Sequence, residues 1–132
     1  MKHCPGLALL ALLGMACITS SANAADRVRA GKWVGTTVAG GKTYPSSSCI
    51  TQSDADAMNG DAKAVKAYLE TVIPPQICKL TDVKVSATQV VYTATCGGQP
   101  ARVVTTSYFG DRSEGTDSAG SRTDAKLVGV CK

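Results

Sequence analysis

Residues 78–96, CKLTDVKVSATQVVYTATC, carry the clearest structural signal in this chain. The two flanks, residues 80–85 and 89–95, are rich in Val, Thr and Tyr, which suit a pleated and half-buried strand. Three small residues between the flanks form a short polar connection. The stretch therefore predicts a β-hairpin. A turn centred on its middle residue places the two terminal cysteines directly opposite each other, where Cβ atoms lie within disulfide range.

Upstream of this hairpin the sequence changes to a helical pattern. Ser53 is placed to cap a first short turn, with Asp54 and Asp56 where carboxylates favour the helix dipole. That turn stops at residues 59–60. Asp61 is placed to cap a second, longer helix, whose apolar residues recur at i, i+3, i+4 and i+7. These residues are Val65, Tyr68, Leu69 and Val72. This second helix is therefore the best candidate to cover the buried face of a sheet.

The first 24 residues have the features of an export signal. Lys2 and His3 supply a positive start, and residues 6–18 form an apolar run without charge. Residues 22–24, Ala-Asn-Ala, are the small-x-small pattern after which signal peptidase cuts. The apolar run is too short to span a bilayer as a permanent helix. The sequence therefore predicts a cleaved signal peptide at residues 1–24.

A second interpretation of the N-terminus makes Cys17 the lipid-bearing residue of a lipoprotein. It is the weaker one, because Gly14 stands three residues before this cysteine, where leucine is usual. Cleavage leaves residues 25–132, which suffice for one domain with one modest core. We therefore expect a single exported domain without a transmembrane segment.

Four cysteines remain once the signal is removed: Cys49, Cys78, Cys96 and Cys131. An even count in a small exported domain is typical of disulfides rather than of metal binding. The chain has no Cys-x-x-Cys pair, and its one histidine, His3, lies in the signal. A zinc site would need four thiolates at wide spacing. The sequence therefore predicts two disulfides and no metal site.

Of the three ways to pair these cysteines, we favour Cys78–Cys96 together with Cys49–Cys131. The first bond closes the hairpin described above. The second ties the end of a predicted N-terminal hairpin to the C-terminus, which suits a sheet that curls round on itself. In the chain-entropy account, the first bond stabilises the fold by about 3 kcal/mol and the second by about 4 to 5 kcal/mol.

Strand-like stretches flank the helical segment and the central hairpin. Residues 31–38 and 42–48 form the N-terminal hairpin, with a glycine turn between them. Pro45 marks the second of these strands as an edge or a bend. Residues 101–130 continue as further strands separated by glycine turns. We therefore predict an α+β fold, a curled antiparallel β-sheet of about six strands in hairpins, with one helical excursion packed on it and two disulfides.

Four short motifs occur in order along the predicted domain. They are Gly31-Lys32-Trp33, residues 47–51 (Ser-Ser-Cys-Ile-Thr), residues 92–96 (Tyr-Thr-Ala-Thr-Cys) and residues 127–131 (Leu-Val-Gly-Val-Cys). Together they resemble the DUF3617 family of proteobacterial periplasmic proteins over essentially the whole domain. That family has no agreed activity. The resemblance therefore implies a fold and a periplasmic location, and it transfers no catalytic residue.

The composition argues against the common catalytic sets. Nucleophilic serine or cysteine chemistry needs an imidazole as its base, and none remains after cleavage of the signal. Asp54 and Asp56 are close in sequence, but capping of a helix is the better interpretation of both. Trp33 is a candidate ligand contact, although the few aromatic residues of the domain favour core packing. We therefore expect no enzyme activity and no cofactor.

The leading hypothesis is a non-catalytic binding or accessory domain of the periplasm, which takes a small apolar ligand or an envelope protein as its partner. The alternative is a small periplasmic inhibitor or envelope-stress factor that acts on another protein. Nucleic acid is not an expected partner, because the positive charges are scattered singly rather than gathered in a block.

Overall fold

The computed structural model of the chain describes residues 26–132. The predicted signal peptide at residues 1–24 and the lipoprotein alternative at Cys17 lie outside the described residues, and both stay predictions. Within the described part, no helix is long and apolar enough to cross a membrane.

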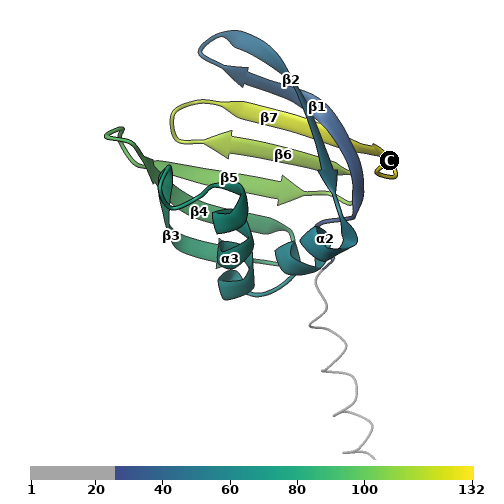
Figure 1. Cartoon of the computed structure of the whole chain (residues 1–132). Coiled ribbons are helices and arrows are strands. Elements are labelled where there is room, and N and C mark those ends of the chain that lie inside the picture. Colours follow the sequence, from purple (N-terminus) through teal and green to yellow (C-terminus); the bar gives the residue numbers. More distant parts are fainter. Residues whose placement is uncertain (1–25) are drawn as a thin grey trace, which may run out of the picture.

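A single antiparallel sheet makes up most of the fold (Figure 1). Its strand order is β2-β1-β7-β6-β5-β4-β3. The strands are β1 (Gly31–Ala39), β2 (Lys42–Ile50), β3 (Cys78–Val85), β4 (Gln89–Cys96), β5 (Arg102–Tyr108), β6 (Arg112–Asp117) and β7 (Arg122–Gly129). The predicted α+β class is confirmed, with seven strands in place of about six. The sheet does not close, because β2 and β3 remain at its two edges.

The helical excursion between β2 and β3 consists of α2 (Gln52–Met58) and α3 (Ala62–Val72). Asp61 caps α3 as predicted, by accepting a hydrogen bond from the Ala64 N–H. The predicted cap of α2 was wrong: the N-cap is Thr51 rather than Ser53. With Thr51 as the N-cap, Asp54 falls at position N3, where its carboxylate accepts the Thr51 N–H and completes a capping box. Asp56 has the same spacing from Ser53, but its carboxylate accepts a hydrogen bond from the Gln52 side chain instead.

The hairpin β3–β4 has the predicted register at its disulfide end. Cys78 lies opposite Cys96, and pairing continues in step as far as Thr81 opposite Thr93. The register then shifts by one residue at a bulge, where Asp82 has a φ of 53°. The shift moves the turn, because the Ser86 N–H now donates to the Gln89 carbonyl across a two-residue connection.

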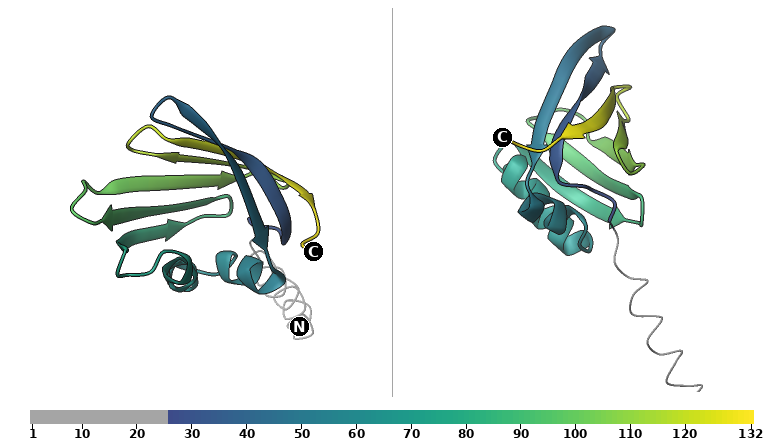
Figure 2. Two further views of the ribbon diagram at one scale, coloured as in Figure 1. Left: turned by 45° about the horizontal axis from the view of Figure 1, so that its top comes forward. Right: turned by 90° about the vertical axis from the view of Figure 1, so that its right-hand side faces the viewer.

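Pairing of β1 with β7 makes the sheet curl, as Figure 2 shows. Trp33 lies opposite Leu127, and Gly35 lies opposite Ala125. A Cβ atom at Gly35 would overlap the carbonyl oxygen of Asp124. A glycine at this position therefore permits the close approach of the two strands.

The main core lies between α3 and the face of β3 and β4 that we call the inner face. Leu80, Val90 and Ala94 point from the sheet toward the helices, and Val65 is fully buried on α3. The core cluster consists of Val28, Met58, Val65, Leu69, Cys78, Leu80, Val90 and Ala94. Both predicted disulfides are present, with Cα–Cα distances of 4.1 Å for Cys78–Cys96 and 5.7 Å for Cys49–Cys131.

Hydrogen bonds from both side chains and backbone connect the segment before β1 to the helices. The Arg27 guanidinium donates to the backbone carbonyl oxygens of Met58, Gly60 and Ser86. The Asn59 side chain accepts the N–H of Val28 and donates to its carbonyl, each at 2.8 Å. These bonds hold together the N-terminal segment, the α2–α3 turn and the tip of the hairpin β3–β4.

A candidate binding cleft on the inner face

A row of small side chains crosses the inner face at its centre. The strand register places Val90, Thr106, Gly115, Thr123 and Thr37 next to one another on five neighbouring strands. Residues directly opposite each other in an antiparallel sheet point to the same face. Because Val90 belongs to the core, the whole row lies on the inner face.

A cleft of about 230 Å³ lies over β5, β6 and β7 along this row. It is lined by Val104, Thr106, Ser113, Gly115, Thr116, Asp117, Ser121 and Thr123. The helices pack against β2 and β3 and leave this part of the sheet free (Figure 2). The cleft is therefore an open hollow, and five of its eight lining residues carry a hydroxyl group.

Gly115 keeps the centre of the cleft open. A Cβ atom at this position would lie 3.6 Å from the Thr123 Cβ and 3.8 Å from the Thr106 Oγ1, which is ordinary van der Waals contact. Its φ is not positive, so the backbone does not require glycine here. The effect of Gly115 is therefore to leave space rather than to permit an unusual conformation.

Asp117 bounds one end of the cleft and is committed to the β6–β7 turn. Its Oδ1 accepts the N–H groups of Ala119 and Ser121, at 2.8 and 3.1 Å. Burial raises the pKa of this carboxyl. The hydrogen bonds from Ser121 and Ala119, together with the charge of Arg102, lower it by more, so the pKa lies below its usual value. Asp117 is therefore ionised and already partnered at neutral pH.

Two tyrosines flank the cleft on its side nearer the core. Tyr108 lies opposite Ser113, and Tyr92 lies opposite Val104, so both point to the inner face. Burial raises the pKa of Tyr108 to about 12, reinforced by Tyr92 and opposed by the positive charge of Arg27. Burial also raises the pKa of Tyr92. Both phenols are therefore neutral at physiological pH.

The chemistry of the cleft is that of hydrogen bonding. Serine and threonine hydroxyls both donate and accept, so they suit a polar ligand without net charge. Among the described residues of the lining, the only ionisable group is Asp117, which is already ionised and partnered. Residues 26–132 contain no cluster of three or more metal-ligating side chains.

A family model described as "protein of unknown function (DUF3617)" matches residues 28–131. The chain belongs to the DUF3617 family. Within residues 26–132 of this DUF3617 protein, the match includes every strand, both helices and both disulfides. No curated protein and no solved structure matches the chain.

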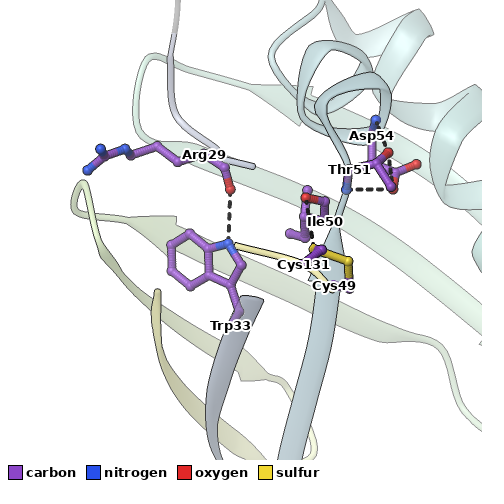
Figure 3. The surroundings of a disulfide bond; sticks show 7 residues. All are labelled: Arg29, Trp33, Cys49, Ile50, Thr51, Asp54 and Cys131. Atoms are coloured by element: carbon purple, nitrogen blue, oxygen red, sulfur yellow. Dashed lines mark hydrogen bonds between the residues drawn. A yellow bond between two sulfur atoms is a disulfide. The ribbon is translucent and has the colours of Figure 1, made fainter. Parts of the chain in front are cut away.

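The predicted ligand contact Trp33 lies outside the cleft. Its indole is 4% exposed, and its Nε1–H donates to the Arg29 carbonyl at 2.9 Å, as Figure 3 shows. A ligand role for Trp33 stays a prediction. Asp54 completes the capping box, and the Asp56 carboxylate accepts a hydrogen bond from the Gln52 side chain.

Sequence reasoning missed the cleft altogether. Its hydroxyl residues come from three strands and are each spaced as in an ordinary half-exposed strand. Only the register of β5, β6 and β7 brings Thr106, Gly115 and Thr123 together. The available signal was Gly115 in the interior of the strand β6, since a glycine within a strand marks a close approach or an open space.

Proposed function

We propose that this DUF3617 protein is a non-catalytic binding domain of the bacterial periplasm, and that it holds a small molecule in the inner-face cleft. The observation that carries the proposal is the hollow over β5, β6 and β7, which the helices leave uncovered and Gly115 keeps open. Ligand sites are typically concave, with a few polar groups that fix orientation.

The lining favours a small polar ligand over the apolar ligand considered from the sequence. Thr106, Ser113 and Thr123 line the cleft with hydroxyl-bearing side chains, of which the Thr123 hydroxyl shares a hydrogen bond with Thr37, and Val104 adds an apolar wall. A volume of about 230 Å³ lies below that of most drug-sized sites, which begin at about 300 Å³. The ligand is therefore a compact, uncharged molecule with several hydrogen-bonding groups.

The non-catalytic part of the proposal rests on composition and on the cleft. The one histidine of the chain is His3, within the predicted signal peptide. General acid–base catalysis works best with a group whose pKa lies near the working pH. Asp117 ionises well below that range, and Tyr108 ionises well above it.

The periplasmic location rests on the N-terminal sequence. It predicts that the protein recovered from the periplasmic fraction begins at Ala25, as N-terminal sequencing would establish. A protein that retains Met1 and remains in the cytoplasm would contradict the location, without bearing on the cleft.

The binding proposal is tested by native mass spectrometry of the protein purified without a tag from its own host. We expect a discrete mass excess that disappears on denaturation. In Gly115→Val, the added side chain fills the cleft, and the mass excess should be lost while the fold persists. The control is Gly129→Val on β7, where nothing lies within 4 Å of the added Cβ.

A bare monomer in the wild type, or equal retention of the ligand by Gly115→Val and Gly129→Val, would refute binding in this cleft. A discrete complex with another protein would instead support the alternative, an inhibitor or envelope-stress factor. The mass measurement therefore separates the two functions.

A further inference from the structure

The two disulfides lie in different surroundings. Cys78 is 8% exposed and belongs to the core cluster, and Cys96 packs against that cluster. Cys49 is exposed on the edge strand β2, and Cys131 is half-buried in the segment that follows β7. A thiol in solution can therefore reach Cys49 directly, whereas in the other bond Cys78 is buried and Cys96 is half-buried.

A cavity of about 320 Å³ adjoins the exposed bond. Besides the two cysteines, its walls include Lys32, Lys132, Ser47 and Ser48. Lys32 lies directly opposite Cys49 in the β1–β2 register, so the two side chains leave the same face of the sheet as neighbours. No carboxylate side chain is among the described residues that line the cavity. The surroundings of this disulfide are therefore electropositive.

We propose that the Cys49–Cys131 disulfide is an exchange site for a small anionic thiol, and that the cavity beside it receives that thiol. The positive charge attracts the anionic thiol and stabilises the cysteine thiolate that forms. This exchange is independent of ligand binding in the inner-face cleft, because the two sites share no residue.

The exchange proceeds in two balanced steps. The thiolate attacks the Cys49 sulfur, the Cys49–Cys131 bond breaks, and its electron pair leaves on Cys131 as a thiolate. A second thiolate then attacks the sulfur of the small molecule in the mixed disulfide. Cys49 departs as a thiolate, and the two small thiols leave as their oxidised disulfide. The protein gains two thiols and two small thiol molecules are oxidised.

Opening this bond releases the C-terminal segment. β7 ends at Gly129, so the disulfide holds residues 130–132 against β2 (Figure 3). The Cys131 sulfur also lies 3.8 Å from the Ile50 carbonyl oxygen, which is a contact rather than a hydrogen bond, because a disulfide sulfur carries no proton. Reduction therefore frees the end of the chain, while Cys78–Cys96 keeps the main core tied.

Graded reduction of the native protein by glutathione tests the proposal. Free thiols are alkylated at intervals, and each cysteine is located by peptide mapping. We expect Cys49 and Cys131 to be alkylated at least tenfold faster than Cys78 and Cys96. Equal rates at the four cysteines, or faster reaction of Cys78, would overturn the proposal.

A charge variant tests the electrostatic part. Lys32→Gln should slow reduction of Cys49–Cys131 by glutathione about threefold, as expected for one charge at close range in water. Reduction by neutral 2-mercaptoethanol should change less. The matched control is Lys42→Gln, at the far end of the same hairpin. An equal effect of Lys32→Gln on both reagents, or no effect on glutathione, would contradict recognition of an anionic thiol.

Discussion

Arg27 is the charged residue that the structure buries most deeply within residues 26–132, at 4% exposed. Burial of a charge is costly unless its hydrogen-bonding groups find partners. Two of the carbonyls that accept from Arg27, those of Met58 and Gly60, lie at the end of α2, where the helix dipole favours a cation. The hydrogen bonds of Arg27 therefore link the N-terminal segment to the helices.

Arg27→Ala is expected to lower the free energy of unfolding by about 3 kcal/mol, because one buried and two part-buried hydrogen bonds to backbone carbonyl groups are lost. Urea denaturation followed by circular dichroism measures the change. The matched control is Arg29→Ala, because Arg29 is exposed and two residues away. An equal loss of unfolding free energy in the two variants would show that Arg27 stabilises the fold through its positive charge alone and not through these hydrogen bonds.

Tyr108 predicts a loss of stability in alkali. Its pKa is raised from 10 to about 12 in the folded state, so folding favours the protonated phenol. The contribution is fully present below pH 10 and is lost as the pH rises from about 10 to about 12. Tyr108→Phe should remove about 2 kcal/mol of this dependence, measured by denaturation at pH 9 and pH 11.5.

The control for this experiment is Tyr44→Phe, since Tyr44 is 48% exposed on the edge strand β2. An unchanged alkaline slope in Tyr108→Phe would mean that other groups account for the dependence, Tyr92 among them because burial also raises its pKa.

At the scale of elements, the glycines of the sheet fall into two kinds. Gly35 lies where a side chain would overlap the backbone of β7, and Gly115 lies where a side chain would only fill space. We expect Gly35→Ala to lower the free energy of unfolding by about 2 to 3 kcal/mol, because β1 and β7 must separate. Gly115→Ala should change it by less than about 0.5 kcal/mol.

Thermal and urea denaturation of the two variants measures the difference, and hydrogen exchange of β1 and β7 amides locates it. Similar stabilities of Gly35→Ala and Gly115→Ala would contradict the close approach of the two strands.

The elements themselves were predictable where a local pattern sets them. The stripe of Val65, Tyr68, Leu69 and Val72 gave α3, and Asp61 gave its start. The start of α2 was misplaced because Thr51 and Ser53 each lie three positions before an aspartate, and the structure forms the capping box with Thr51. The capping pattern was present in the sequence, but both Thr51 and Ser53 fit it.

The bulge in β3 shows the limit of predicting register from symmetry. A turn centred on Ala87 accounts for the pairing of Cys78 with Cys96. Nearer the tip of the hairpin, the strand register differs by one residue from the one that this turn predicts. Asp82 absorbs one extra residue with a positive φ, which aspartate tolerates better than most residues. Residues in this conformation are not marked by hydrophobic alternation, so the bulge was invisible in the sequence.

Pro45 was predicted to mark an edge or a bend, and β2 is an edge of the sheet. In the two-residue hairpin β1–β2, Lys42 and Ala39 flank the turn, so odd-numbered residues of β2 direct their backbone groups outward. Pro45 therefore removes a hydrogen-bond donor from the free edge, where such donors invite pairing with other chains.

At the scale of the whole molecule, the two disulfides tie different parts of the fold. Cys78–Cys96 joins neighbours in one hairpin, with a sequence separation of 18, and Cys49–Cys131 joins residues separated by 82. The disulfide pairing was predictable because Cys78 and Cys96 lie opposite each other in one hairpin. Cys49 and Cys131 are then left to pair with each other. The cleft was not predictable, because it depends on the side-by-side placement of three strands.

Removal of either disulfide should destabilise the domain, and the loss should be larger for the bond that closes the longer loop. We expect losses of about 3 kcal/mol for Cys78→Ala/Cys96→Ala and about 4 to 5 kcal/mol for Cys49→Ala/Cys131→Ala. Urea denaturation of the oxidised proteins measures both. A smaller loss for the Cys49–Cys131 pair would show that residues near the C-terminus remain ordered without the cross-link.

Within residues 26–132, five of the six strand pairings join strands that follow each other in the chain, and only β1–β7 does not. Residues 40–121 separate β1 from β7, so their pairing closes a long loop and comes after the local hairpins have formed. Hairpins form in microseconds, so β1 and β2 pair long before that and leave the second edge of β1 open. Completion of the sheet is therefore a late event that requires the entire chain, and a truncation before β7 would leave both β1 and β6 with a free edge.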